Sequence, residues 1–122
     1  MFNRRAATEP RELLPGVTLR TLAHGERTLL AEVRLTRGAV IPEHRHPQEQ
    51  TGYLVSGRLE FSIDGAKLVA EPGSSWSLPA DLPHGASALE DSVVVEVFSP
   101  VRGDYLPQAE PRGEAPNGGD PE

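Results

Sequence analysis

Two of the four histidines in this chain have the spacing of a pair that could bind a metal ion. His44 and His46 are two residues apart, and in an extended strand residues i and i+2 project to the same face, so their imidazoles could share one ion. His84 follows later, at a turn into another strand-like segment. His24 lies in a different expected turn with no partner nearby in sequence, so we interpret it as an exposed turn residue.

The elements that must position these side chains are short strands. Alternation is clearest at 58–64, where Leu59, Phe61 and Ile63 share one face and Asp64-Gly65 supplies a tight hairpin turn. No segment shows helical periodicity, so we expect an all-β barrel or sandwich. Segments rich in β-branched or aromatic residues and bounded by turn residues lie at 17–23, 27–36, 51–57, 58–64, 67–70, 75–78 and 92–98.

Length and composition limit the chain to one small domain and exclude several partners. The 122 residues include 12 Gly and 12 Pro, which disfavours long helices. With 12 basic against 18 acidic residues, the net charge of −6 offers no basic surface for nucleic acid or an anionic membrane. No apolar run approaches the roughly 20 residues needed to cross a bilayer, and no signal peptide is evident, so we expect the cytoplasm. Because cysteine is absent, a metal must use histidine, carboxylate or amide ligands.

Three parts are expected along the chain. The N-terminal arm, 1–13, is charged and aperiodic, and both a frayed arm and a strand lent to a neighbouring molecule remain open. The barrel is expected at 14–106. The tail, 107–122, is acidic and rich in Pro and Gly, and it has too few apolar residues to offset the entropy of ordering, so we expect it to be disordered.

The spacing of two motifs resembles that of the cupin superfamily. The first motif, G(x)5HxH(x)3,4E(x)6G, fits residues 38–57, with Gln50 at the glutamate position. The second, G(x)5PxG(x)2H(x)3N, fits from residue 73 through Pro79 and His84, with Asp81 and Ala88 at the glycine and asparagine positions. The resemblance implies a single-domain double-stranded β-helix, or jelly-roll, barrel with one metal inside.

This resemblance assigns His44, His46 and His84 as imidazole ligands and Gln50 as the oxygen ligand. Such a set, with open positions for water or substrate, suits one divalent transition metal: Ni, Fe, Mn, Zn or Co. The neutral amide leaves the site one charge more positive than a glutamate would, which favours an anionic substrate. Glu49 is a rival ligand, but in an extended segment it points away from the face that holds Gln50. The alternative is a cupin without a metal, whose histidines are polar core residues.

A closer resemblance concerns the last strand and its exit. The phrases HRHPQEQTGYLVSGRLEF and EVFSPVRGDYL are similar to the small cupins of pectin and alginate breakdown that linearise 4,5-unsaturated monouronates. In that family an acid, a phenylalanine and an arginine act beside the metal, and the matching positions here are Glu96, Phe98 and Arg102. The family has aspartate where this chain has Glu96, so the acid is one methylene longer.

Alternation alone gives a competing interpretation of Glu96. An ionised carboxylate is costly inside a central strand unless it has a partner or a function. Val93, Val95 and Val97 form the better core face by alternation, which would leave Glu96 in solvent. The resemblance favours the opposite orientation, with Glu96 facing the metal.

The function implied is that of a metal-dependent enzyme acting on a small anionic sugar-derived substrate. Glu96 would move a proton during ring opening, Arg102 would pair with the substrate carboxylate, and Phe98 would wall the pocket. Two other classes stay open: a metal-dependent cupin dioxygenase, and a non-catalytic module that binds or senses a small molecule. The resemblance also implies a homodimer, and we expect neither a nucleic-acid partner nor a membrane partner.

Overall fold

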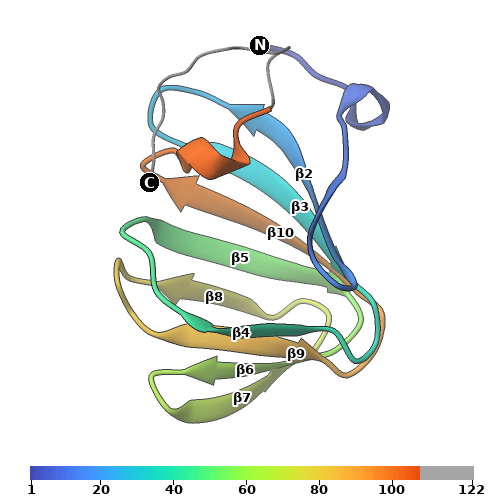
Figure 1. Ribbon diagram of the computed structural model, residues 1–122, viewed down its shortest axis with the longest axis vertical. Helices are drawn as coiled ribbons and strands as arrows, with labels where there is room; N and C mark the ends of the chain where they lie inside the picture. The colour runs from blue at the N-terminus through green and yellow to red at the C-terminus, as the bar shows by residue number, and fades with distance from the viewer. Residues whose placement is uncertain (108–122) are drawn as a thin grey trace.

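The computed structural model describes residues 1–107, and nearly all of its regular structure is β-strand. The two antiparallel sheets are a six-stranded one of order β1-β2-β3-β10-β5-β8 and a four-stranded one of order β4-β9-β6-β7 (Figure 1). This architecture confirms the predicted all-β jelly-roll barrel. No helix in the described part of the chain is long and apolar enough to span a membrane. The tail predicted for 107–122 lies, except for Pro107, outside the described residues.

The strands are β1 (Arg11–Leu14), β2 (Val17–His24), β3 (Leu29–Leu35), β4 (Val40–His44), β5 (Glu49–Ser56), β6 (Leu59–Ile63), β7 (Ala66–Ala70), β8 (Ser75–Leu78), β9 (His84–Ala88) and β10 (Ser92–Ser99). Two short 3-10 turns, η1 (Arg5–Ala7) and η2 (Gly103–Tyr105), flank them.

Every segment that alternation and composition predicted as a strand forms one, and three further strands were not among those segments. β4 contains Pro42, which lacks a backbone N–H donor and is tolerated because β4 is the edge strand of its sheet. β9 has the sequence HGASA, which carries few side chains typical of strands. β1 is short and charged. These strands form through pairing with their neighbours rather than through local propensity.

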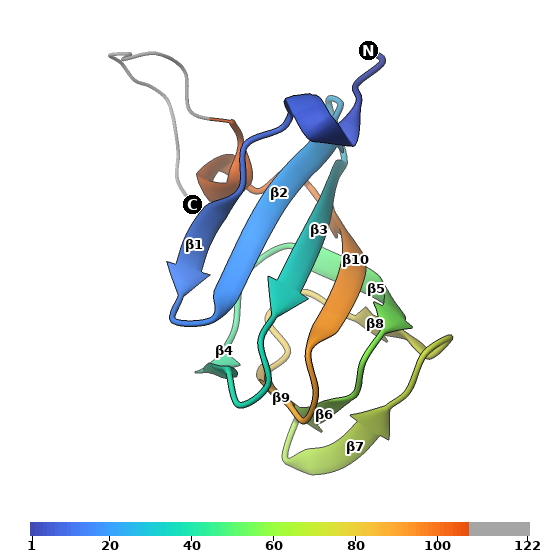
Figure 2. The same ribbon diagram turned by 90° about the vertical axis from the view of Figure 1, so that its right-hand side faces the viewer.

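The N-terminal arm is held by its own molecule. Arg11–Leu14 pairs antiparallel with β2, so this part of the arm is an edge strand of the six-stranded sheet (Figure 2). Of the arrangements considered from sequence, neither a frayed arm nor a strand lent to a neighbour describes these residues in the structure. Since β1 borders the interior, its Leu13 and Leu14 help to close the barrel.

The core fills the space between the two sheets. β10 lies at the centre of the larger sheet, where it pairs with β3 on one side and β5 on the other (Figure 1). The largest fully buried side chains are Leu19, Leu29, Leu54, Leu59, Leu78 and Val17. They come from both sheets, so the packing fixes the sheets relative to one another and with them the residues that line the interior.

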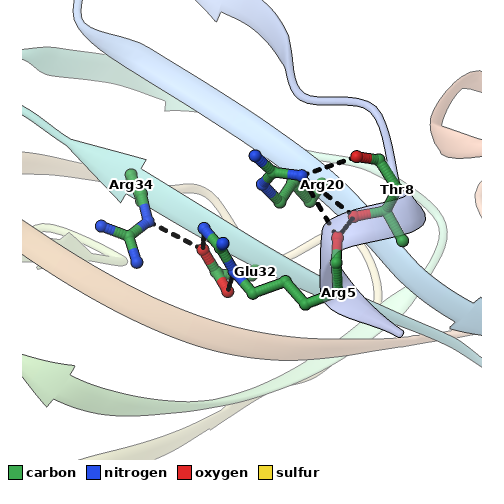
Figure 3. A network of polar contacts seen from close by, with 5 residues as sticks. All are labelled: Arg5, Thr8, Arg20, Glu32 and Arg34. Atoms are coloured by element: carbon green, nitrogen blue, oxygen red, sulfur yellow. Dashed lines mark hydrogen bonds and ion pairs between the residues drawn. The ribbon is translucent and has the colours of Figure 1, made fainter. Parts of the chain in front are cut away.

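An ion-pair network fastens the arm to the outer face of the six-stranded sheet (Figure 3). Glu32 on β3 is only 7% exposed, and it accepts hydrogen bonds from Arg5 Nε at 2.8 Å and Nη2 at 2.9 Å. Arg34 Nε donates to the same carboxylate at 2.8 Å. Arg20 Nη1 donates to the Thr8 carbonyl oxygen at 2.6 Å. The hydrogen bond from Arg5, with that from Arg34, lowers the pKa of Glu32 to about 2.

The low pKa of Glu32 predicts a pH-dependent part of the stability. Because the folded pKa of about 2 lies below the ordinary value of 4.5, ionised Glu32 stabilises the fold above pH 4.5, and this contribution is lost as the pH falls toward 2. At pH 7 we expect Glu32→Gln to lower the free energy of unfolding by about 2 kcal/mol, the scale of hydrogen bonds to a charged group.

Urea unfolding of both proteins between pH 7 and pH 2 measures this difference. The gap between wild type and Glu32→Gln should narrow below pH 4.5. Glu26→Gln, which changes an exposed glutamate in the β2–β3 turn, is the matched control and should leave stability unchanged. A gap that stays constant down to pH 2 would show that the carboxylate does not carry the effect.

Candidate metal centre

Three histidines come together at the junction of β4 and β9. His44 ends β4 and pairs in register with His84, the first residue of β9. His46 follows β4 and lies outside the strand, so the expected two-histidine clip spans a strand end and a loop. One nitrogen atom from each imidazole lies within 4.8 Å of the others. His46 and His84 are buried, whereas His44 is exposed.

A backbone carbonyl two residues away orients each imidazole. The pairs are His44 Nδ1 with the Pro42 oxygen at 2.9 Å, His46 Nδ1 with the Gln48 oxygen at 3.0 Å, and His84 Nδ1 with the Leu82 oxygen at 2.7 Å. A neutral imidazole that donates from Nδ1 keeps a lone pair on Nε2, which is the arrangement of histidine metal ligands. His84 Nε2 is also the one buried side-chain polar atom without a hydrogen-bond partner among residues 1–107.

The electrostatics keep two of these imidazoles neutral. Burial lowers the pKa of His46, and the positive charge of Arg102 adds to this effect. Burial also lowers the pKa of His84, although its hydrogen bond to the Leu82 carbonyl acts in the opposite direction. Since a metal binds only the unprotonated imidazole, these side chains are in the required form at neutral pH.

Gln50 presents an oxygen to the histidines. Its Oε1 lies 3.0 Å from His46 Nε2, while its Nε2 donates to Glu96 Oε2 at 2.5 Å. Because His46 Nδ1 carries the proton that is donated to the Gln48 carbonyl oxygen, His46 Nε2 carries a lone pair, as Gln50 Oε1 also does. Two such atoms 3.0 Å apart attract one another only when a cation or a proton lies between them. The residues therefore fit a divalent metal. Glu49 is exposed on the opposite face, as predicted.

Glu96 points from β10 into the barrel. Its residues alternate between buried and half-buried positions along the whole strand. The inward side chains include Val94, Glu96 and Phe98, and the outward ones include Val93, Val95 and Val97. The expectation from alternation alone is therefore wrong, and the inward orientation that the family resemblance favoured is the one observed. Three valines fit either face of a central strand, and the groups that donate hydrogen bonds to Glu96 come from other strands.

Two donors hold the Glu96 carboxylate. Gln50 Nε2 and Trp76 Nε1 both donate to Oε2, the latter at 3.2 Å. Burial raises the pKa of Glu96, and these hydrogen bonds oppose part of that rise. A Cβ atom at Gly52 would lie 2.3 Å from Trp76 Nε1, so only glycine lets the indole approach. Because its amide N–H donates to Glu96, Gln50 keeps its carbonyl oxygen toward the histidines.

Arg102 follows β10 and lies against two aromatic rings. Its guanidinium carbon is 5.3 Å from the Phe98 ring centre and 4.0 Å from that of Tyr105. Asp104 accepts from Arg102 Nη2 at 2.7 Å and from Nε at 3.2 Å. The sequence interpretation missed Trp76, Tyr105 and Asp104. The spacing of Arg102 and Asp104 and the single tryptophan of the chain were the available signals.

A cavity of about 370 Å³ joins these groups. His44, Gln50 and His84 line it together with Glu96, Phe98 and Arg102, whereas His46 is not among its lining residues. The remaining wall is largely aliphatic and includes Leu13, Leu14, Val33, Leu35, Ile41 and Leu59. The cavity thus offers a small ligand a cluster of histidines, a buried acid and an arginine at one polar end.

The fold is that of a known family. A family model for the cupin domain matches residues 31–99, and the chain therefore belongs to the cupin family.

Among its relatives is the pectin degradation protein KdgF of Dickeya dadantii (strain 3937), 29% identical over 97 residues, which are 78% of this chain and 88% of that protein. The solved structure of KdgF from Halomonas sp. matches with a TM-score of 0.82 and 35% identity, covering 87% of this chain and 98% of that one. An RmlC-like cupin from Shewanella frigidimarina also gives 0.82, at 26% identity, covering 86% and 95% of the two chains.

Proposed function

We propose that this protein is a metal-dependent enzyme that linearises 4,5-unsaturated uronate monomers. The observation that carries the proposal is that Glu96, Phe98 and Arg102 line the same cavity as His44 and His84. The similarity to two KdgF proteins, one of them described as a pectin degradation protein, supports a substrate derived from pectin.

Four residues would hold the metal. His44, His46 and His84 would bind through Nε2, and Gln50 through Oε1. One divalent ion from the group Ni, Fe, Mn, Zn and Co suits this set of neutral ligands. When bound, it supplies Lewis-acid stabilisation of negative charge on substrate oxygens.

The chain's own residues bind the substrate and move its proton. Glu96 uses Oε2 for both of its hydrogen bonds within the described residues, which leaves Oε1 to exchange a proton with the substrate. Burial raises the pKa of Glu96, and a raised pKa suits a carboxyl that both accepts and returns a proton. Arg102 pairs with the substrate carboxylate, and Phe98 walls the pocket beside it.

The reaction is an isomerisation and is balanced without a redox partner. The C1 hydroxyl loses its proton as the bond between C1 and the ring oxygen breaks, and the ring oxygen takes up a proton, which leaves an aldehyde at C1 and an enol hydroxyl at C5. Loss of the enol hydroxyl proton together with addition of a proton at C4 gives the open-chain 5-keto form, so no net proton is gained or lost. Glu96 would carry the proton between these positions. Its place in the cavity lining and its burial away from bulk water support this role.

Loss of the ultraviolet absorbance of an unsaturated galacturonate monomer tests the proposal. We expect metal-loaded protein to accelerate this loss over the spontaneous rate, with full activity in the absence of air, and chelated protein to have no effect. Acceleration that requires air and consumes oxygen would favour a dioxygenase instead. Ligand-induced stabilisation without product would favour a non-catalytic binding module.

The homodimer and the cytoplasmic location expected from sequence stay predictions. The outer face of the six-stranded sheet carries Tyr53 and Val55, which are 50% and 49% exposed. Light scattering on the purified protein measures its mass directly. A mass twice that of one chain would support the homodimer, and the mass of one chain would exclude it.

A further inference from the structure

We propose that the Asp104 carboxylate competes with a ligand carboxylate for Arg102, and that it thereby lowers the affinity of the site for any acidic ligand. The proposal rests on the proposed function, because it takes Arg102 as the group that binds the ligand carboxylate. It adds a residue that sets how strongly this arginine prefers a carboxylate to a neutral group.

Asp104 occupies one edge of the Arg102 guanidinium in the way a ligand carboxylate would. Its two oxygens accept separately from Nη2 at 2.7 Å and from Nε at 3.2 Å, which is the bidentate geometry of arginine with an acid. Both residues line the cavity that His44 and His84 also line. An incoming carboxylate therefore meets an arginine whose charge is already paired.

The two partners differ in how firmly they are held. The Arg102 side chain is 14% exposed and lies over the Phe98 and Tyr105 rings, so its position does not depend on Asp104 alone. The Asp104 side chain is 51% exposed. Its backbone is fixed separately, because Arg11 Nη2 donates to the Asp104 carbonyl oxygen at 2.7 Å. The carboxylate can therefore rotate away while the chain stays in place.

Removing the negative charge of Asp104 therefore favours an acidic ligand. Two carboxylates near one guanidinium repel each other, and the ligand must displace Asp104 or bind beside it. A half-exposed ion pair contributes little to stability, so displacing Asp104 from Arg102 costs a small but measurable free energy. A neutral ligand meets no such repulsion. With Asp104 present, a carboxylate ligand therefore binds tightly only when it also makes other contacts, such as those at the histidine cluster.

Calorimetric titration with D-galacturonate and D-galactose tests this proposal. Both sugars lack the double bond, so binding is measured apart from turnover, and a failure of the uronate reaction leaves this test intact. We expect Asp104→Asn to bind galacturonate roughly two- to fivefold more tightly than wild type. Its affinity for galactose should be unchanged.

Two further variants identify the cause. Glu43→Gln removes another acid that lines the cavity, and it should produce a smaller gain than Asp104→Asn if the effect runs through Arg102. In an Arg102→Gln background, adding Asp104→Asn should give no gain. Galacturonate binding that is unchanged or weaker in Asp104→Asn would overturn the proposal, as would an equal gain in Glu43→Gln. Matching melting curves establish that the variants are folded.

Discussion

Glu96→Gln is expected to abolish turnover while the protein keeps its metal. The substituted amide has nearly the same shape, and its oxygen can still accept the hydrogen bonds from Gln50 and Trp76. Gln50 then keeps its carbonyl oxygen toward the histidines, so the metal ligands are undisturbed. The amide cannot exchange a proton, and loss of a general acid–base group lowers the rate by about 10²- to 10⁴-fold.

Two measurements on the same sample test this prediction: the turnover rate at saturating substrate, and the metal content of the protein. Glu49→Gln is the matched control, because it makes the same change at an exposed position on β5, the strand that carries Gln50. The control should retain its activity and its metal. A Glu96→Gln protein that turns over substrate at the normal rate would remove Glu96 from the mechanism.

His84→Ala should lose both the metal and the activity. His84 Nε2 is buried and has no hydrogen-bond partner among residues 1–107, so in the proposed site the metal is its partner. Removing a direct ligand should weaken metal binding by more than the roughly 10- to 100-fold typical of changes to residues that only orient ligands. Metal titration followed by calorimetry measures this loss independently of substrate.

The melting temperature gives a second measure of the same variant. Adding metal should raise the melting temperature of wild type and leave that of His84→Ala unchanged, because a ligand stabilises only the protein that binds it. Without metal the variant should be somewhat less stable than wild type, because it loses the packing of the ring and the Nδ1 hydrogen bond to the Leu82 carbonyl oxygen. His24→Ala, which changes an exposed histidine, should respond to metal like wild type. A metal-induced rise in the His84→Ala protein would contradict the proposed ligand set.

The fold and the members of the candidate site were predictable where the information is local. Strands such as β6 and β10 have β-branched and aromatic residues bounded by turns, so their own sequence identifies them. That the histidines and Gln50 would meet was implied by the resemblance of two motifs to those of cupins, since His84 is distant in sequence from the other three residues. β4 and β9 were not among the predicted strands, since Pro42 and a run of small residues obscure the pattern.

The surroundings of the site depend on tertiary contacts and were not predictable from local pattern, although the family resemblance did favour the inward orientation of Glu96 that is observed. The direction of Glu96 depends on Gln50 and Trp76, which come from β5 and β8 and are distant in sequence. The alternation of residues within β10 carries no information about these partners on other strands. The pairing of Arg102 with Asp104 is local, yet its importance comes from the cavity that both residues line.

The position of β10 has a consequence for how the chain is made. This strand is the last of the barrel to leave the ribosome, yet it inserts between β3 and β5, which are made much earlier. Until residues 92–99 emerge, β3 and β5 lack their shared neighbour and present unpaired backbone groups that favour aggregation. Because the same strand carries Glu96 and Phe98, the barrel closes and the polar end of the cavity is completed in one late event during synthesis.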